Sequence, residues 1–568
     1  MKNKKQGAVA VYVVLCMAVL LTVSLAVSSW AAHSLLRVKQ DRNSTIAQQA
    51  SFAALDHMTG KAFSDLSSNN GKFVYTAMNY NSLVNPLASG ASANVWVTPA
   101  SDKLAYITST VTYKGITRSV RNYVLAKEVG IWNNAVFAGS GAAGQAVNGN
   151  VDIRGSMHIL GDGEPYTDLN GNGVHDDAES FIDLPPKNGI WDPGELFTDA
   201  NGDGVYTYAE PYNDVNNNGV YDPPMTQTSL DTQFGGTAYV GNNYSGAPSS
   251  LLAQMPPIPT LGGVGTLGAE VRVKHGLIAI SGSAQIGTSD VVDGGASKSQ
   301  VDGMYVNDGY AGNKGASAVF SDNGTTNTYD LGNIGLQFPI ISGIGAQTYT
   351  DSSGIAWTTQ QQYLDARALV IPKSSVSETS GAFSYGPDAY GNSISFTPKS
   401  SGSPAKISIQ GVVKIAGDFQ LGSPKDTIVY DGNGTLYASG NLNIDASVTP
   451  ASGKIFPTQA RMGFIAGHNM NLATGSGSAQ LTLAGAFYAQ GTIKSAKQNQ
   501  IAGTFVASFF DMGTNVPNIY QVPLLTTNMP PAMPGDKRYF SLKVRTFRDR
   551  SPLPGQSDSF AGGNPFTG

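Results

Sequence analysis

The sequence predicts a mainly β fold behind one long N-terminal α-helix, with a small antiparallel sheet after the helix and a large body of stacked strands after the sheet. Three observations predict this order. Between Gly7 and Gly60 there is no glycine or proline, apolar and polar residues alternate from Leu104 to Ala126, and a short apolar sequence with a glycine recurs in the last third. These patterns are typical of a helix, a hairpin and stacked strands, respectively.

Composition narrows the class of protein. The chain has 568 residues, of which 13% are charged, and its hydrophobic content of 41% is enough to build a core. The formal net charge of −5 gives no reason to expect nucleic acid as a partner. The single cysteine, Cys16, lies in an apolar run and excludes intrachain disulfides.

The N-terminal helix is expected over residues 8–63. Residues 8–32 are 25 residues without a charge, which is long enough to cross a bilayer, and the continuation to Phe63 is amphipathic. A cleaved secretory signal and an uncleaved single-span anchor are the alternatives.

This N-terminus resembles that of the type IV pilins, and most closely that of the PilX-type minor pilins. The shared features are a short basic leader that ends at Gly7, an apolar helix that begins at Ala8, and the amphipathic continuation. The resemblance implies cleavage of leader residues 1–7, methylation of Ala8 and packing of the helix with other pilins or pilus assembly proteins. We expect a single-pass protein of the bacterial inner membrane with a body that is periplasmic or on the cell surface. The long Gly-rich remainder is typical of an exported segment, which puts the N-terminus in the cytoplasm. Tyr12 stands where pilins usually have glutamate, which argues against a major subunit and leaves a minor or tip role.

Beyond the helix, changes in composition and in the pattern of apolar residues divide the chain. Glycines 417, 440, 467, 485 and 503 each follow an alanine or serine in a similar apolar context, and their spacing of 18 to 27 residues predicts a β-solenoid. A β-sandwich of irregular strands is the alternative. The only helix expected in this part is 358–369. The expected divisions are a small α+β head (64–130), a first β-rich segment (131–161), an insert (162–224), a β-rich region (225–400), solenoid-like repeats (401–550) and a disordered tail (551–568).

The insert is the most acidic part of the chain. Its 63 residues contain 14 Asp and Glu and one basic residue, Lys187, so that it has a charge of −13. Because like charges repel, we expect it to need a cation to compact.

The spacing of oxygen-bearing residues in the insert predicts calcium. Two segments match the twelve-residue calcium loop in full, with a glycine at position 6 and a glutamate at position 12. In the other two segments the pattern is partial: one has an extra residue and no certain first ligand, and the other has Met225 in place of the glutamate. The predicted calcium ligands are Asp168, Asn170, Asn172, Val174, Asp176 and Glu179; Asn188, Ile190, Asp192 and Glu195; Asp199, Asn201, Asp203, Val205, Thr207 and Glu210; and Asp214, Asn216, Asn218, Val220 and Asp222.

The loops resemble those of EF-hands. Because prolines crowd their flanks, they are more similar to the helix-poor tandem loops of dockerin- or thrombospondin-type repeats. The alternative is an acidic, turn-rich loop that binds nothing specifically. His175 lies at a non-ligand position and is expected to face solvent, whereas Trp191, Tyr206 and Tyr221 are expected to pack on the loops or to stack on sugar rings.

No sequence pattern indicates an enzyme. None of the six histidines forms an HExxH or HxH pair, and no nucleophile elbow or phosphate-binding loop is present. We therefore expect an exported structural or adhesive protein of a type IV pilus, which could bind surface glycans or a host surface. A pseudopilin-like tip component of a type II secretion system and a membrane-anchored β-helix that binds or cleaves carbohydrate are the alternatives.

Overall fold

The structure is a computed structural model. It describes residues 4–69, 72–101, 104–142, 152–202, 204–224, 232–234, 238–261, 264–275, 277–280, 285–286, 304–306, 309–312, 319–321, 336–511, 517–535 and 539–548. The chain divides into two compact units, Met1–Val129 with Tyr539–Gly568, and Gly130–Arg538. The expected tail, 551–568, lies outside the described residues.

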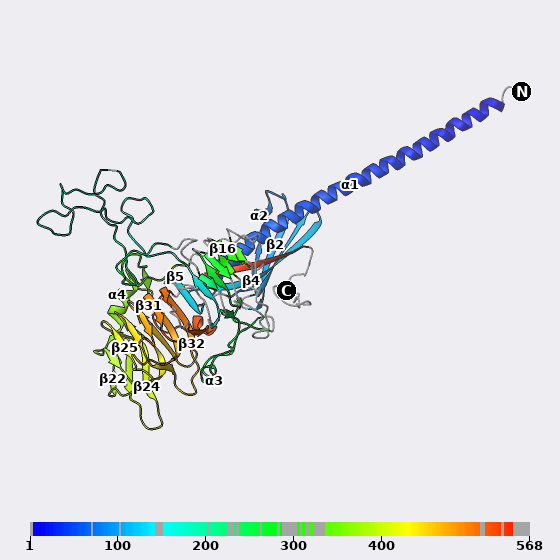
Figure 1. Cartoon of the computed structure of the whole chain (residues 1–568). Coiled ribbons are helices and arrows are strands. Elements are labelled where there is room, and N and C mark those ends of the chain that lie inside the picture. The colour runs from blue at the N-terminus through cyan, green and yellow to red at the C-terminus, as the bar shows by residue number, and fades with distance from the viewer. Residues whose placement is uncertain are drawn as a thin grey trace. The chain divides into compact units, whose positions relative to one another are not determined.

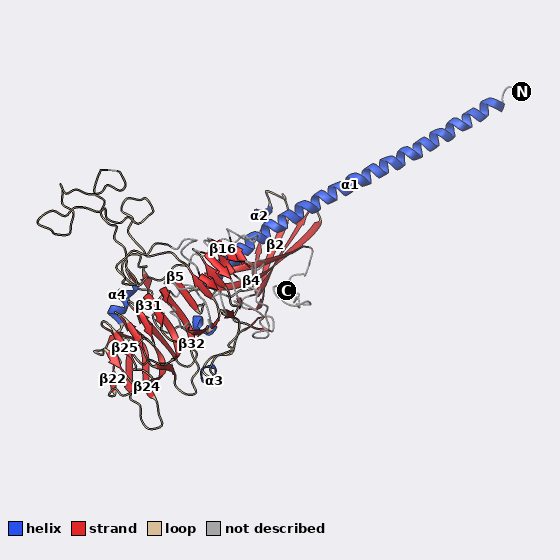
Figure 2. Ribbon diagram, in the orientation of Figure 1, coloured by secondary structure: helices blue, strands red, loops and turns tan. Residues whose placement is uncertain are grey.

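The first unit is one long helix packed on an antiparallel sheet (Figures 1 and 2). The strands lie in the order β1-β2-β3-β4-β34, and each pair of neighbours is antiparallel. Its elements are α1 (Lys4–Ser68), β1 (Thr76–Asn79), α2 (Asn81–Val84), β2 (Ser92–Ser101), β3 (Leu104–Tyr113), β4 (Ile116–Val129) and β34 (Tyr539–Arg548).

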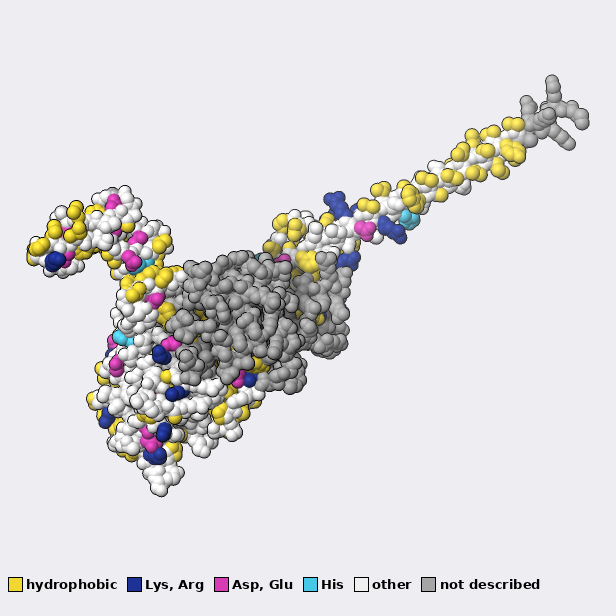
Figure 3. Space-filling model, in the orientation of Figure 1, with side chains coloured by type: hydrophobic (Ala, Val, Ile, Leu, Met, Phe, Trp, Pro, Cys, Tyr) yellow, Lys and Arg dark blue, Asp and Glu magenta, His cyan; other side chains and the backbone are white. Residues whose placement is uncertain are grey.

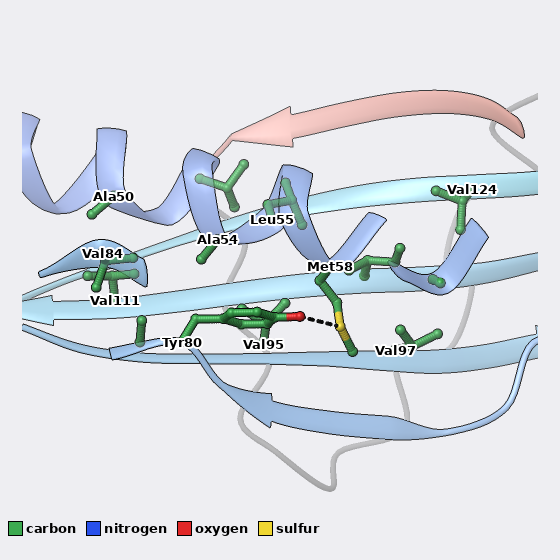
Figure 4. Close-up of a cluster of buried hydrophobic side chains, with 14 of the residues drawn as sticks. Ala50, Ala54, Leu55, Met58, Tyr80, Val84, Val95, Val97, Val111 and Val124 are labelled. Carbon is green, nitrogen blue, oxygen red and sulfur yellow. Dashed lines mark hydrogen bonds between the residues drawn. The ribbon is translucent and has the colours of Figure 1, made fainter. Parts of the chain in front are cut away.

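Only the C-terminal part of α1 contributes to the core of this unit. Small residues such as Ala50 and Ala54 let the helix approach the sheet, and Leu55 and Met58 fill the space between them (Figure 4). The hydroxyl of Tyr80 donates a hydrogen bond to the sulfur of Met58, at 3.3 Å. The second half of α1 is therefore held by contacts with the sheet, unlike its apolar first half.

The second unit consists mostly of short strands and the loops between them (Figure 2). Its first elements are β5 (Val136–Ala142), β6 (Asp152–Arg154), β7 (Met157–Ile159), β8 (Thr232–Phe234), β9 (Tyr239–Gly241), α3 (Ser249–Leu252), β10 (Thr260–Leu261), β11 (Val264–Gly265), β12 (Val271–Val273), β13 (Leu277–Ile280), β14 (Gln285–Ile286), β15 (Met304–Val306), β16 (Gly309–Gly312), β17 (Val319–Ser321), β18 (Tyr349–Thr350), β19 (Ala356–Trp357) and α4 (Gln360–Arg367). They are followed by β20 (Leu369–Val370), β21 (Ser375–Val376), β22 (Phe383–Tyr385), β23 (Ser393–Thr397), β24 (Ala405–Ile415), β25 (Phe419–Leu421), β26 (Thr427–Ala438), β27 (Leu442–Ile444), β28 (Ser447–Pro450), β29 (Arg461–Ala466), β30 (Met470–Leu472), β31 (Thr482–Ser495), β32 (Gln500–Asp511), β33 (Asn518–Tyr520) and the 3-10 helix η3 (Pro523–Thr527).

Long parallel ladders connect the strands of the last third. β24 pairs with β26, β26 with β29, β29 with β31, β31 with β32, and β32 with β5, all in parallel. Aromatic side chains from successive strands stack inside, with the rings of Phe464 and Phe487 5.1 Å apart and nearly parallel. The core is therefore continuous from one strand to the next.

Polar side chains at one corner repeat the same hydrogen bond from strand to strand. Asp418 accepts the backbone N–H of Asn441, Asn441 accepts that of Asn469, and Asn469 accepts that of Thr492, at 2.7, 3.1 and 2.7 Å. The partners are 23, 28 and 23 residues apart. This column satisfies backbone groups at a corner where the ladder is interrupted.

Several expectations from the sequence are confirmed. The fold is mainly β with a long N-terminal helix and a small antiparallel sheet, the 104–126 hairpin forms as β3 and β4, and α4 lies within 358–369. Two details differ. β34, which was assigned to the repeats, pairs with β4 of the head. The five motif glycines also do not form one column. One column contains Gly417, Gly440, His468 and Gly491, so that the residue after Gly467 takes the place of that glycine. Gly485 instead pairs with Gly503.

Candidate cation-binding repeats and the apolar helix

The acidic segment contains four similar loops, called here by the number of their first residue: loop 168 (168–176), loop 183 (183–192), loop 199 (199–207) and loop 214 (214–222). In each, the carboxylate of the first aspartate accepts the backbone N–H of the glycine that corresponds to position 6, where the extra residue of loop 183 is left out of the position count. Those four glycines have φ between 75° and 79°, a conformation that a side chain disfavours. Loop 183 therefore has its first aspartate, Asp183, which the sequence pattern left undetermined.

Polar side chains at positions 3, 5 and 9 converge in loops 168 and 214, and two of these positions are hydrogen-bonded in each of loops 183 and 199. The amide nitrogens of Asn170 and Asn172 both donate to a carboxylate oxygen of Asp176, at 2.6 and 2.8 Å. Asn216 and Asn218 make the same bonds to Asp222, Asn188 donates to Asp192, and Asn201 donates to Thr207. The predicted ligand Asp203 lies outside the described residues. At position 7, the side chains of Val174, Ile190, Val205 and Val220 are exposed, which leaves only their carbonyls for a cation.

A glutamate closes each loop by binding it at two points. Each of these glutamates lies four residues before the first aspartate of another loop, so that it belongs to a different repeat when a repeat is counted from its glutamate. In loop 168 the Glu210 carboxylate accepts the N–H groups of Leu169 and Asp176, at 2.6 and 3.3 Å. The N–H of Glu210 also donates to the carbonyl of Asp176. The same three bonds join Glu179 to loop 199, Glu195 to loop 183 and Glu164 to loop 214.

These bonds place Glu179 and Glu210 differently from the sequence pattern. As position-12 residues they were assigned to loops 168 and 199, respectively, whereas each carboxylate is bonded to the other of these two loops. Glu195 is bonded to loop 183, as assigned. Glu164, which was not among the predicted ligands, is bonded to loop 214, the loop in which Met225 replaces the glutamate. Its signal in the sequence is that each glutamate precedes the first aspartate of a loop by four residues, with Tyr or Phe between them.

Aromatic side chains join the loops in two nested pairs. The residues at position 8 stack on one another: His175 of loop 168 on Tyr221 of loop 214, and Trp191 of loop 183 on Tyr206 of loop 199, with centroids 3.9 and 4.8 Å apart. Short antiparallel bridges, Tyr166 with Tyr212 and Phe181 with Phe197, flank the same two pairs. We call loops 168 and 214 the outer pair, and loops 183 and 199 the inner pair.

The expectation that His175 faces solvent is wrong. Its side chain is only 3% exposed. It lies among Tyr166, Tyr212 and Tyr221, and its Nε2 is 3.0 Å from the carbonyl oxygen of Glu210. Trp191, Tyr206 and Tyr221 pack on the loops, as was expected.

The outer pair is the part of the segment that contacts the stacked strands. Lys274 forms an ion pair with Asp162 at 2.6 Å. The amide of Asn213 donates to the carbonyl of Ser342, and Asn469 of the corner column donates to the carbonyl of Asn216. The loops are thus connected to the polar column at the corner of the β body.

Electrostatics favours a cation in these loops. The four closing glutamates are buried, at 2 to 8% exposure. Burial, together with the negative charges of Asp222 and Asp214, raises the pKa of Glu164 to about 7. In contrast, the backbone N–H groups of Gly173 and Gly171 lower the pKa of Asp168.

The donor set fits calcium, which takes carboxylate, amide and carbonyl oxygens. Rotating an asparagine amide by half a turn would direct Oδ1 inward in place of the nitrogen. The buried Oδ1 of Asp183 has no hydrogen-bond partner among the described residues, and a bound cation would satisfy this oxygen. Within the described part of the chain, no three His, Cys, Asp or Glu side chains converge closely enough to hold a metal by themselves, so amide and carbonyl oxygens would have to complete each site. Figure 3 shows acidic and apolar side chains side by side on the loops.

The second candidate site is the first half of α1. Val9, Leu20 and Trp30 are more than 60% exposed, and hydrophobic side chains cover this part of the helix up to a group of basic residues (Figure 3). The helix has a stretch with a mean hydropathy of 2.6, and none of that stretch is buried in the protein. By length and composition it is able to cross a membrane. Gly7 and Ala8 lie within the helix, which begins at Lys4.

Together, these features define a protein with an exposed apolar helix, a helix-on-sheet head and a β-rich body with acidic loops. No family model matches the chain, and no curated protein is similar to it. Among solved structures, it is similar to the competence-associated pilin ComZ from Thermus thermophilus, with 15% sequence identity and a TM-score of 0.47. That similarity covers 90% of this chain and 98% of the other.

Proposed function

We propose that the protein is a membrane- or filament-associated minor pilin whose extracellular β body has a structural or adhesive role and is stabilised by calcium. The observation that supports this most is the division of α1. Its large hydrophobic side chains between Val9 and Val38 are exposed, whereas several residues between Ala47 and Leu66 are buried in the core of the head. A helix of this kind suits a subunit whose free half inserts into lipid or packs among the helices of other subunits.

The β body fits the role of a rigid extension. Its parallel ladders and repeated corner bonds support a solenoid, in which each strand pair adds to one continuous core. Adhesion of the surface of this body to a glycan or a host surface is the function to test.

Calcium is proposed to hold the acidic loops in their folded form. At the affinity typical of extracellular calcium modules, ~10⁻⁴–10⁻³ M, a free concentration one hundredfold above Kd stabilises the folded state by about 2.7 kcal/mol per site. Differential scanning calorimetry of the full chain with calcium and with a chelator tests this step. An unchanged unfolding profile would argue against calcium stabilisation.

The pilin assignment is tested by the mature N-terminus. Mass spectrometry of the protein isolated from its natural membrane should show a chain that begins with N-methylated Ala8 and lacks residues 1–7. A chain that begins with Met1 would leave α1 as a plain membrane anchor and would contradict the pilin assignment.

A further inference from the structure

We infer that the acidic segment binds its cations in two reciprocal pairs of loops, in which each loop is completed by the glutamate of its partner repeat, so that Glu164 is the missing ligand of loop 214. This inference rests on the proposed calcium binding. Beyond that proposal, the inference specifies which glutamate completes each site and which two loops form a pair.

The first argument is the position of each carboxylate. Glu179 accepts the N–H groups of Ala200 and Thr207, which are positions 2 and 9 of loop 199. These amides lie beside two ligand positions of the loop, Asp199 and Thr207 itself. The carboxylate is therefore next to the ligands of loop 199, whereas the sequence pattern assigns it to loop 168. All four loops have this arrangement, which makes it a property of the repeat.

A nearby cation would also stabilise the buried carboxylates. Burial of a carboxylate beside other carboxylates disfavours its charged form, and a cation offsets this cost. Glu164 is 2% exposed and lies close to Asp214 and Asp222. Among the residues that the structure describes, Asp183 is partly exposed but its Oδ1 atom is buried without a hydrogen-bond partner, and a cation in the inner pair would satisfy it.

The second argument is reciprocity. Glu164 precedes loop 168 and closes loop 214, whereas Glu210 precedes loop 214 and closes loop 168. The inner pair makes the same exchange with Glu179 and Glu195. A cation in one loop therefore orders the segment that supplies a ligand to the other loop, and the stacked aromatic residues at position 8 connect the two. Binding within a pair should be positively cooperative, because the first cation contributes to ordering the second site.

Two glutamates distinguish this arrangement from one in which every loop uses its own twelfth residue. In the reciprocal arrangement, Glu179 acts in the inner pair and Glu210 in the outer pair. In the local arrangement, Glu210 completes loop 199 of the inner pair and Glu179 completes loop 168 of the outer pair. The variants Glu179→Gln and Glu210→Gln each remove one negative charge. In the reciprocal arrangement Glu179→Gln weakens the inner pair, whereas in the local arrangement Glu210→Gln does so.

Trp191 provides a reporter for the inner pair, because it belongs to loop 183 and stacks on Tyr206 of loop 199. Terbium, which replaces calcium in oxygen sites, is titrated into the full chain in detergent micelles. Luminescence is excited through tryptophan, and the variant Trp191→Phe defines the background from other tryptophans. Competition with calcium shows that the signal comes from calcium sites.

The reciprocal arrangement predicts that Glu179→Gln raises the terbium concentration at half-maximal signal by about tenfold or more, and that Glu210→Gln leaves it within about twofold. It also predicts that Glu164→Gln lowers the number of bound calcium ions without changing the tryptophan-excited signal. A weaker signal in Glu210→Gln with an unchanged one in Glu179→Gln would overturn the inference, and so would an equal loss in both. If the unaltered chain bound neither terbium nor calcium, calcium binding itself would be wrong, which is a distinguishable result.

Discussion

Replacing Gly467 by alanine tests whether the corners of the β body are packed directly against one another. A Cβ atom at this position would lie 2.4 Å from the carbonyl oxygen of Ser439, in the preceding corner. Both segments are held by backbone hydrogen bonds, since Gly467 donates to Ala438 and His468 donates to Gly440. The added methyl group must therefore push two bonded segments apart. Overpacking of this kind costs about 1–3 kcal/mol of the free energy of unfolding.

The matched control is Gly381→Ala. A Cβ atom at Gly381 meets no atom within 4 Å, and the residue does not require a positive φ. This change should leave stability unchanged or raise it by about 0.4–1 kcal/mol through the unfolded state. Urea denaturation of the full chain in detergent micelles, followed by far-ultraviolet circular dichroism, measures both. If Gly467→Ala were as stable as Gly381→Ala, the direct packing of successive corners would be refuted.

Three further predictions concern the head and the first strands of the β body. Leu55→Ala should lower the stability of the head by about 2–5 kcal/mol in thermal unfolding, because the side chain is fully buried, whereas Leu87→Ala at a half-exposed site should change it by less than about 0.5 kcal/mol. Gly60→Ala should stabilise the head by about 0.8–1 kcal/mol, since no atom lies within 4 Å and alanine favours the helix; a loss of stability would show that α1 is not continuous there. Burial, with smaller contributions from Arg272 and Lys274, lowers the pKa of His158 well below 6.5, so that the unfolded chain takes up a proton first as the pH falls. His158 should therefore lower stability between pH 7 and pH 5, by up to about 1.4 kcal/mol per pH unit below about 6.5, and this contribution opposes that of Glu164, whose raised pKa adds stability as the pH falls through about 7. His158→Phe should remove the His158 contribution; parallel pH profiles of the two proteins would contradict the assignment.

Local patterns in the sequence predict the elements whose partners are near in the chain. The absence of glycine and proline after Gly7 predicts α1, and the alternation from Leu104 to Ala126 predicts β3 and β4. The pairing of β34 with β4 joins opposite ends of the chain, and no local pattern contains it. The sequence also shows which glycines recur but not which of them stack. That depends on the length of each connection, which changes between β29 and β32.

The acidic segment shows the same limit at the scale of a site. Candidate ligand positions within a loop follow from a twelve-residue window, and in loops 168 and 214 the side chains at positions 3, 5 and 9 lie together. Glu164 lies outside the window of loop 214, because it belongs to a repeat three loops earlier. Nesting of the first repeat with the fourth, and of the second with the third, is a tertiary arrangement. It is visible in the aromatic pairs His175–Tyr221 and Trp191–Tyr206, and only in the folded chain.

Calcium binding by the four loops is tested most directly by the number of calcium ions bound per chain. Equilibrium dialysis of the full chain in detergent micelles against about 10 mM calcium should give about four ions per chain, because this concentration exceeds the expected Kd by about tenfold or more. Magnesium, which demands a tighter octahedral shell, should not displace them at equal concentration. A chain that retains no calcium under these conditions would contradict the account.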